Sequence, residues 1–136
     1  MKRTATAIWN GTIKEGSGNL TTASSVLNKT QYSFKSRFEE GTGTNPEEFL
    51  AAAHAGCFTM KLSLNLTEAG YNPDELMTES TIHMADGKIS KSELVVTASV
   101  PGIAEHEFQK LAQDAEKNCP VSKAFAFEIT MEARLQ

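Results

Sequence analysis

The segment between Asn45 and Gly70 is the feature that most constrains the fold. Asn45 can cap a helix with its side chain, Pro46 suits the first helical position, and Gly70 is typical of the position just beyond a helix end. The residues between them follow a helical pattern to Glu68-Ala69. The sequence therefore predicts one long helix in the middle of the chain, with Glu48 closing a capping box in its first turn.

Three antiparallel strands are expected before this helix. Their approximate ranges are 3–14, 18–26 and 31–38. Turns rich in glycine break up the first two runs. In the third run the side chains alternate, which places Tyr32, Phe34 and Phe38 on one face and Arg37 on the opposite face.

The segment after the helix predicts a hairpin, a second helix and a last strand. Asp86-Gly87 joins two alternating runs and is a strong hairpin signal. An amphipathic helix is expected over 103–118, then a turn or short helix, then a strand over 125–135. The order βββ-α-ββ-α-β predicts an α+β fold with antiparallel sheets, and the length predicts a single domain over 1–136.

Composition and charge exclude several classes of protein. The chain carries 17 acidic and 13 basic residues, for a net charge of −4, and has no run of Lys and Arg. No nucleic-acid partner is therefore expected. No apolar run approaches the ~20 residues of a membrane span, and no secretory signal pattern opens the chain, so no membrane association is expected. These features predict a cytoplasmic protein.

The two cysteines, Cys57 and Cys119, lie far apart in the sequence and form no CxxC motif. Two buried, unreactive thiols are one interpretation. Cys119 precedes Pro120, a residue that suits the start of a new helical turn, where free backbone N–H groups favour a thiolate. Cys57 lies within the long helix, where burial disfavours the thiolate. A reactive Cys57 would need its pKa lowered by about 2 units from ~8.5, or roughly 2.7 kcal/mol.

A cation must supply that stabilisation, and Arg37 is the best candidate. An arginine turned into a pocket needs an acid to hold it, and Glu47 or Glu48 could serve. The alternative is an exposed arginine on a strand. Ten residues of regular helix span ~15 Å, so Glu47 and Cys57 do not touch directly if the helix is straight. Either an arginine bridges them or the helix bends near Gly56, a residue that is costly in a helix interior.

His54 lies three residues before Cys57 and can share a helix face with it. A Cys–His pair is found in acyl-transfer enzymes and in metal sites. No second pair of ligands has metal spacing, so no metal is expected. A structural or merely polar histidine remains the other interpretation.

The segments "RFEEGTGTNPEEFLAAAHAGCF" and "NCPVS" together resemble the OsmC/Ohr family of thiol-dependent organic hydroperoxide reductases. The run "AAHAGCF" and the opening "AIWNG…GSGNLTTASSVLN" are more similar to the OsmC branch. The resemblance extends over nearly the whole chain. It implies an intertwined homodimer in which sheets of both chains surround central helices, with a site at each subunit interface.

The resemblance also implies a role for each of four residues. Cys57 matches the peroxidatic cysteine, which becomes a sulfenic acid as it reduces the hydroperoxide to an alcohol. Cys119 matches the resolving cysteine, which forms an intrachain disulfide with Cys57. Arg37 matches the residue that stabilises the thiolate, and Glu47 matches the acid that positions Arg37.

Substrate and reductant follow from the same resemblance. The substrate would be an organic hydroperoxide, met in oxidative or osmotic stress. No bound cofactor is expected. The reductant would be an external dithiol such as a dihydrolipoyl group, carried by a lipoylated protein. A pocket for bulky peroxides is expected from nearby apolar residues, namely Phe38, Phe49, Phe58 and Met60.

Two other functions stay open at this point. A non-catalytic protein of the same fold could bind a small apolar ligand, in which case Cys57 has an ordinary or raised pKa. A Cys–His acyl-transfer enzyme could use Cys57 and His54 without Cys119.

Overall fold

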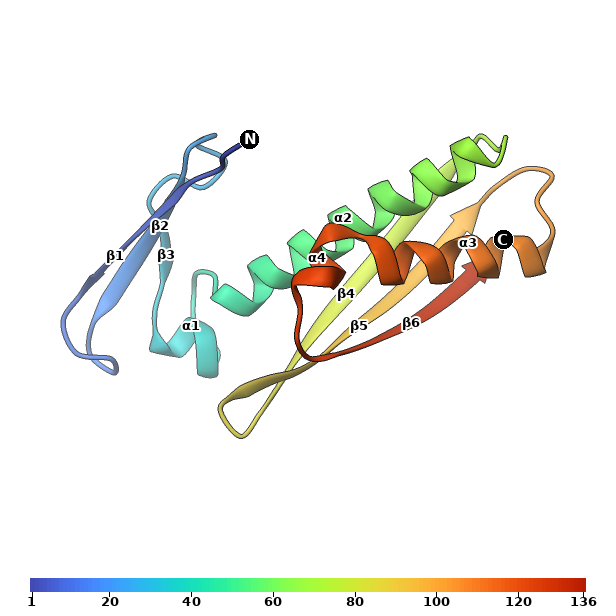
Figure 1. Cartoon of the computed structure of the whole chain (residues 1–136). Helices are drawn as coiled ribbons and strands as arrows, with labels where there is room; N and C mark the ends of the chain where they lie inside the picture. The colour runs from blue at the N-terminus through green and yellow to red at the C-terminus, as the bar shows by residue number, and fades with distance from the viewer. The chain divides into compact units, whose positions relative to one another are not determined.

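The computed structural model describes all residues from Met1 to Gln136. They form two compact units, Met1–Phe49 and Leu50–Gln136. The elements are, in chain order (Figure 1), β1 (Ala5–Asn10), β2 (Ser17–Thr22), β3 (Thr30–Tyr32), α1 (Phe34–Phe38), α2 (Pro46–Glu68), β4 (Glu75–Ala85), β5 (Lys88–Ser99), α3 (Glu105–Asn118), α4 (Pro120–Ala124) and β6 (Glu128–Leu135). The α+β class and the expected order are confirmed, with α1 as an addition. The single domain stays a prediction.

The first unit contains an antiparallel sheet with the strand order β1-β2-β3. Gly18 lies directly between Trp9 and Tyr32 in the register of the three strands. The centres of the Trp9 and Tyr32 rings are 5.4 Å apart. A Cβ atom at Gly18 would come within 2.7 Å of both rings. The absence of a side chain therefore lets the two aromatic rings meet across the middle strand.

The predicted third strand is wrong beyond Tyr32, because residues 34–38 form the helix α1. Ser33 and Ser36 make a reciprocal capping box: the Ser36 N–H donates to Ser33 Oγ at 3.2 Å, and the Ser33 N–H donates to Ser36 Oγ at 2.8 Å. The Ser36 hydroxyl also reaches the Thr44 carbonyl at 2.8 Å. These local bonds stabilise a helical turn where side-chain alternation alone indicates a strand.

Helix α2 begins and ends where the sequence predicts. The Glu48 N–H donates to Asn45 Oδ1 at 2.8 Å, which confirms the cap. The Glu48 carboxylate accepts from the Thr44 hydroxyl instead of completing the capping box. At the other end Gly70 has φ +93°, and its N–H and that of Tyr71 bond to the last carbonyls of the helix. The helix is continuous through Gly56.

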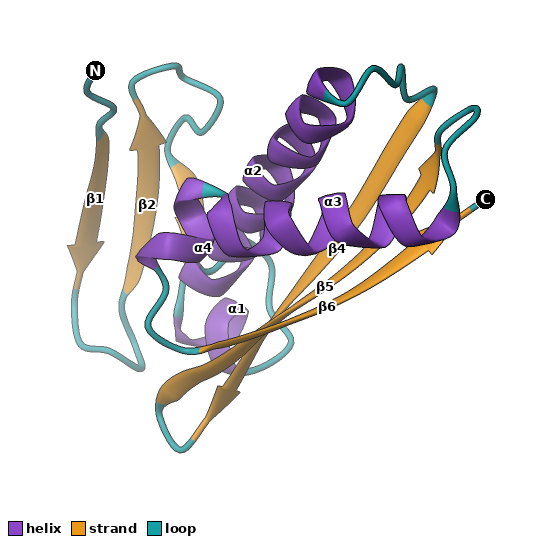
Figure 2. Cartoon of the chain, turned by 45° about the vertical axis from the view of Figure 1, so that its right-hand side comes forward, coloured by secondary structure: helices purple, strands orange, loops and turns teal.

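The second unit contains the sheet β4-β5-β6, with α2 and α3 on one of its faces (Figure 2). Asp86 and Gly87 both have positive φ, as expected for the tight turn between β4 and β5. Strand β6 pairs with β5 in parallel, so the prediction of antiparallel pairing is wrong for this one pair of strands. A parallel neighbour needs a crossover connection, and α3 and α4 provide it.

The main core lies between this sheet and its helices. Within strand β5, from Ser92 to Ala98, every second side chain is buried. The apolar residues that are fully buried are Phe58, Leu62 and Leu66 of α2, Leu94, Val96 and Ala98 of β5, Phe108, Ala112 and Ala115 of α3, and Cys119. One cysteine is therefore part of the core itself, and Cys57 packs against that core.

Candidate functional site

The second cysteine, Cys119, lies at the junction of α3 and α4. Its N–H donates to the Ala115 carbonyl at 2.9 Å and ends α3. Its Sγ accepts the Ser122 N–H at 3.3 Å and caps α4, which starts at Pro120. The prediction that Cys119 faces free backbone N–H groups is confirmed. The thiol is fully buried.

Cys57 lies on α2 and is partly exposed, and both cysteines are free thiols. Burial raises the pKa of the Cys57 thiol, a backbone hydrogen bond from Val121 lowers it, and the neighbouring Cys119 thiol raises it again. The net pKa lies above the ordinary value. These interactions place Cys57 against the start of α4 and next to Cys119, although the two residues are far apart in sequence.

An apolar groove gives solvent access to Cys57. Its volume is about 550 Å³. The residues that line it are Cys57, Met60, Lys61, Leu64, Asn118 and Pro120. Met60 is 77% exposed and Leu64 47% exposed. The groove thus brings apolar side chains beside the accessible thiol of Cys57, while the Cys119 thiol is buried.

In the first unit, Arg37 and Glu47 form the ion pair that the sequence predicts. Arg37 Nη2 is 2.8 Å and Nε 3.1 Å from Glu47 Oε1, and Nε is 3.3 Å from Oε2. The Glu47 side chain is only 12% exposed and that of Arg37 is 36% exposed. Arg37 comes from helix α1, so its predicted place on a strand is wrong. Two-point contact fixes the plane of the guanidinium.

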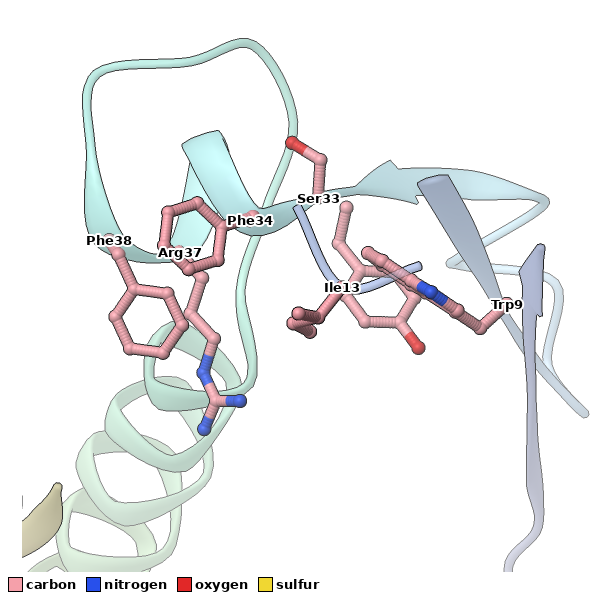
Figure 3. Close-up of a pocket in the computed structure, with 7 residues that line it drawn as sticks. Trp9, Ile13, Ser33, Phe34, Arg37 and Phe38 are labelled. Carbon is pink, nitrogen blue, oxygen red and sulfur yellow. The ribbon is translucent and has the colours of Figure 1, made fainter. Parts of the chain in front are cut away.

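Arg37 also borders a small aromatic cavity within the first unit, shown in Figure 3. The cavity has a volume of about 230 Å³ and is lined by Trp9, Ile13, Tyr32, Ser33, Phe34, Arg37 and Phe38. The Arg37 guanidinium carbon lies 5.0 Å from the centre of the Phe38 ring. This distance is typical of a cation–π contact.

The four residues predicted for a substrate pocket lie in different surroundings. Phe38 lines the aromatic cavity of the first unit, and Met60 lines the groove beside Cys57. Phe49 is half-buried. Phe58 is fully buried in the core and is not among the residues that line either cavity. Their role as one pocket stays a prediction.

His54 is fully buried and is not paired with Cys57. Its Nδ1 is 2.6 Å from Ser92 Oγ, and its Nε2 is 2.8 Å from Ser122 Oγ. Both ring nitrogens therefore have serine partners, which argues against the Cys–His pair of an acyl-transfer enzyme. Neither Ser92 nor Ser122 was predicted from the sequence. Only Ser122 has a local pattern that could have indicated a role, because it stands three residues after Cys119, the cap of α4.

No group of three or more His, Cys, Asp and Glu side chains comes together as metal ligands. None of the helices combines the length and the hydropathy that crossing a lipid bilayer requires.

Comparison of the sequence with known proteins gives consistent matches. The family described as "OsmC-like protein" matches residues 39–134. The chain is 43% identical over 134 residues to the peroxiredoxin OsmC of Escherichia coli, with 96% of this chain and 94% of that protein covered. It is 33% identical over 86 residues to organic hydroperoxide resistance protein-like 1 of Staphylococcus saprophyticus, with 60% and 61% covered.

Solved structures share the fold. An OsmC-like protein from Mycoplasma pneumoniae matches with a TM-score of 0.78 at 15% identity, covering 99% of this chain and 97% of that one. The organic hydroperoxide resistance protein OhrB of Bacillus subtilis matches with a TM-score of 0.64 at 23% identity, covering 98% of each chain. At these identities the likeness concerns the fold.

Proposed function

We propose that this chain, which belongs to the OsmC-like protein family, is a peroxidase that reduces organic hydroperoxides to alcohols through its two cysteines. The observation that carries the proposal is the approach of Cys57, in an apolar groove, to the buried Cys119. One accessible thiol with a second thiol behind it is what a two-cysteine cycle requires. The names of the relatives, peroxiredoxin OsmC and organic hydroperoxide resistance protein, support the same chemistry.

The proposed cycle has three steps. The Cys57 thiolate attacks the O–O bond, a sulfur–oxygen bond forms, and the alkoxide leaves and takes up a proton as the alcohol. The Cys119 sulfur then attacks the sulfenic acid of Cys57, an S–S bond forms, and water leaves. An external dithiol, which we propose is a dihydrolipoyl group of a lipoylated protein in the cytoplasm, reduces the disulfide by thiol exchange and becomes oxidised.

The first step needs a thiolate, and we propose that Arg37 supplies the positive charge that favours it. Burial and the second thiol hold the pKa of Cys57 above its ordinary value, so a cation must act in the opposite sense. Glu47 binds Arg37 through Nε and Nη2. Glu47 would therefore orient the guanidinium and leave Nη1 free for the thiolate or the peroxide.

The apolar surface of the groove supports a preference for bulky alkyl peroxides. Met60 and Leu64 lie beside Cys57 and present apolar side chains to solvent. Burying them against an alkyl group contributes ~25 cal/mol per Å² of apolar surface removed from water, whereas hydrogen peroxide gains nothing from them. We also propose that the working protein is a homodimer in which the groove beside Cys57 stays accessible to the peroxide.

The proposal is tested by turnover of cumene hydroperoxide with dihydrolipoamide. We expect the unchanged protein to turn over and to form a Cys57–Cys119 disulfide, seen as a mass loss of two hydrogens after one equivalent of peroxide. Hydrogen peroxide should react more slowly. Cys119→Ser should stop at a sulfenate that dimedone traps. If the unchanged protein and Cys119→Ser consume peroxide at the same slow rate, a protein that binds an apolar ligand becomes the better interpretation. The raised pKa of Cys57 is in line with that alternative.

Arg37→Ala is expected to slow the oxidation of Cys57 by about 100-fold at pH 7, because ~2 pKa units of thiolate stabilisation are lost. The measurement is the second-order rate constant for cumene hydroperoxide in single turnover. Lys35→Ala is the matched control, because Lys35 is an exposed cation on the same short helix. Equal rate constants in Arg37→Ala and Lys35→Ala would remove Arg37 from the mechanism.

A further inference from the structure

A line of hydrogen bonds runs through the interior of the second unit and ends at Cys119. Ser92 Oγ is 2.6 Å from His54 Nδ1, and His54 Nε2 is 2.8 Å from Ser122 Oγ. Ser122 Oγ is in turn 3.1 Å from Cys119 Sγ. Ser92, His54 and Cys119 are fully buried, and Ser122 is 7% exposed. Four polar groups thus connect strand β5, helix α2 and helix α4.

Helix capping alone does not explain this line. The cap of α4 needs only the bond from the Ser122 N–H to Cys119 Sγ, which the backbone of any residue except proline can make. The Ser122 hydroxyl and the His54 ring are additional buried polar groups. Burying such groups costs free energy that their hydrogen bonds only offset, and an apolar pair of similar size would pack as well.

We propose that Ser122 and His54 relay the proton that the Cys119 thiol loses when it closes the disulfide. This inference rests on the proposed two-cysteine cycle. Ser122 touches the reacting sulfur, and His54 acts through Ser122. A thiol that attacks a sulfenic acid must give up its proton, and Cys119 is cut off from bulk water by burial. The hydrogen-bonded serine is the polar side chain next to that sulfur.

The hydrogen bonds are compatible with transfer in this direction. The relay uses the arrangement in which the Cys119 S–H donates to Ser122 Oγ, the Ser122 O–H donates to His54 Nε2, and the His54 Nδ1–H donates to Ser92 Oγ, which the three contact distances allow. A proton from Cys119 moves to Ser122 as the Ser122 proton moves to Nε2, which leaves a thiolate, a neutral serine and an imidazolium. The thiolate displaces hydroxide from Cys57, and the hydroxide takes a proton from solvent in the groove. The imidazolium then releases its proton through Ser122, which is 7% exposed, to solvent. This proton replaces the one that the hydroxide took, so the net products are the disulfide and one water.

Burial favours the neutral form of His54, which is the form that can accept a proton. Burial lowers the pKa of His54 below its ordinary value of 6.5, so the ring is neutral at pH 7. The residues that face it are Ser92 from β5, Ser122 from α4 and Phe125, whose ring lies roughly perpendicular to the imidazole with the ring centres 5.0 Å apart.

Charged side chains of the packed elements point elsewhere. Lys91 and Glu93 of β5 alternate with Ser92 and pair with each other at 3.0 Å on the opposite face of the sheet. Lys123 of α4 and Glu79 of β4 are exposed. The titratable neighbours of the relay are therefore the two thiols themselves.

The test separates the two chemical steps in a single turnover. Reduced protein is mixed with excess cumene hydroperoxide, and samples are quenched for Cys57 sulfenate, trapped with dimedone, and for disulfide, measured by mass. Ser122→Ala removes one oxygen atom and keeps the backbone donor to Cys119. We expect disulfide closure to slow by about 100-fold, within the range of proton-transfer catalysis, and sulfenate formation to stay within about twofold. His54→Asn should act in the same way.

The pH profile distinguishes a relay from a structural role. In the unchanged protein, closure should be constant from pH 7 to 9, because the relay takes the proton. In Ser122→Ala the rate should rise with pH, by up to about tenfold per unit, because hydroxide must remove the proton. Ser122→Thr restores a hydroxyl and should restore a flat profile. Ser90→Ala, at an exposed serine of the same sheet, is the control.

Two results would overturn the inference in different ways. Normal sulfenate formation, together with closure rates and pH profiles in Ser122→Ala and His54→Asn that equal those of the unchanged protein, refutes the relay alone. Absence of any Cys57 sulfenate in the unchanged protein refutes the proposed function, and the relay with it.

Discussion

Cys57→Ser is expected to reduce peroxide turnover to the level of buffer. A serine hydroxyl is not ionised near neutral pH and does not form a sulfenate, so the step that breaks the O–O bond has no nucleophile. The change replaces sulfur by oxygen at a partly exposed position, so the fold should be retained. The measurement is consumption of cumene hydroperoxide with dihydrolipoamide at several protein concentrations.

Cys119→Ser provides the matched comparison, because it removes the other thiol and keeps Cys57. It should still consume about one equivalent of peroxide per chain before it stops. Turnover by Cys57→Ser at the rate of the unchanged protein would contradict the assignment of the nucleophile.

Phe58→Ala is expected to lower the free energy of unfolding by about 3–5 kcal/mol. Phe58 is fully buried and belongs to the core between α2 and the second sheet. Its removal leaves a cavity that the surrounding side chains of β5 and α3 can fill only in part. The measurement is urea unfolding followed by far-UV circular dichroism, with the reduced protein at a fixed concentration.

Met60→Ala is the control for this prediction, because Met60 lies two residues after Phe58 on the same helix and its side chain is 77% exposed. We expect a change within about 0.5 kcal/mol, because Met60 lines the solvent-accessible groove. A loss in Met60→Ala that grows at lower protein concentration would instead indicate that Met60 is covered in a dimer. Equal small losses in both variants would contradict the placement of Phe58 in the core.

The elements whose signals are local could be predicted from the sequence. Asn45 and Gly70 set the ends of α2 because a side-chain cap and a left-handed glycine act on the nearest turn. Asp86-Gly87 sets the hairpin for the same reason, since both residues adopt the positive φ that the tight turn requires.

Predictions failed where two local signals competed or where the partner is distant. Residues 34–38 alternate like a strand, yet the Ser33–Ser36 capping box and the bond from Ser36 to Thr44 favour a helix. The parallel pairing of β6 with β5 depends on how α3 and α4 cross the sheet, which no short pattern in either strand encodes.

In the candidate site, too, residues with local motifs were predictable and residues brought together by packing were not. The motifs around Cys57 and Cys119 made both residues recognisable, and the ion pair of Arg37 with Glu47 was expected from the need to hold an arginine. The partners of His54 could not be foreseen. Ser92 and Ser122 are ordinary serines in the sequence, and they meet one imidazole only because β5 and α4 pack against α2.

The position of Cys119 as the shared cap of two helices has a consequence for the oxidised protein. Helix α4 has only five residues, and a helix of that length is not stable by itself in water, so it depends on its cap and its packing. The sulfur that accepts the Ser122 N–H is also the sulfur that would enter the disulfide. Disulfide geometry restricts the side-chain torsions of both cysteines, so bonding to Cys57 would draw the Cys119 sulfur away from the Ser122 N–H. Oxidation of one atom would therefore loosen a whole helical turn, and the redox state of the chain would be coupled to its secondary structure.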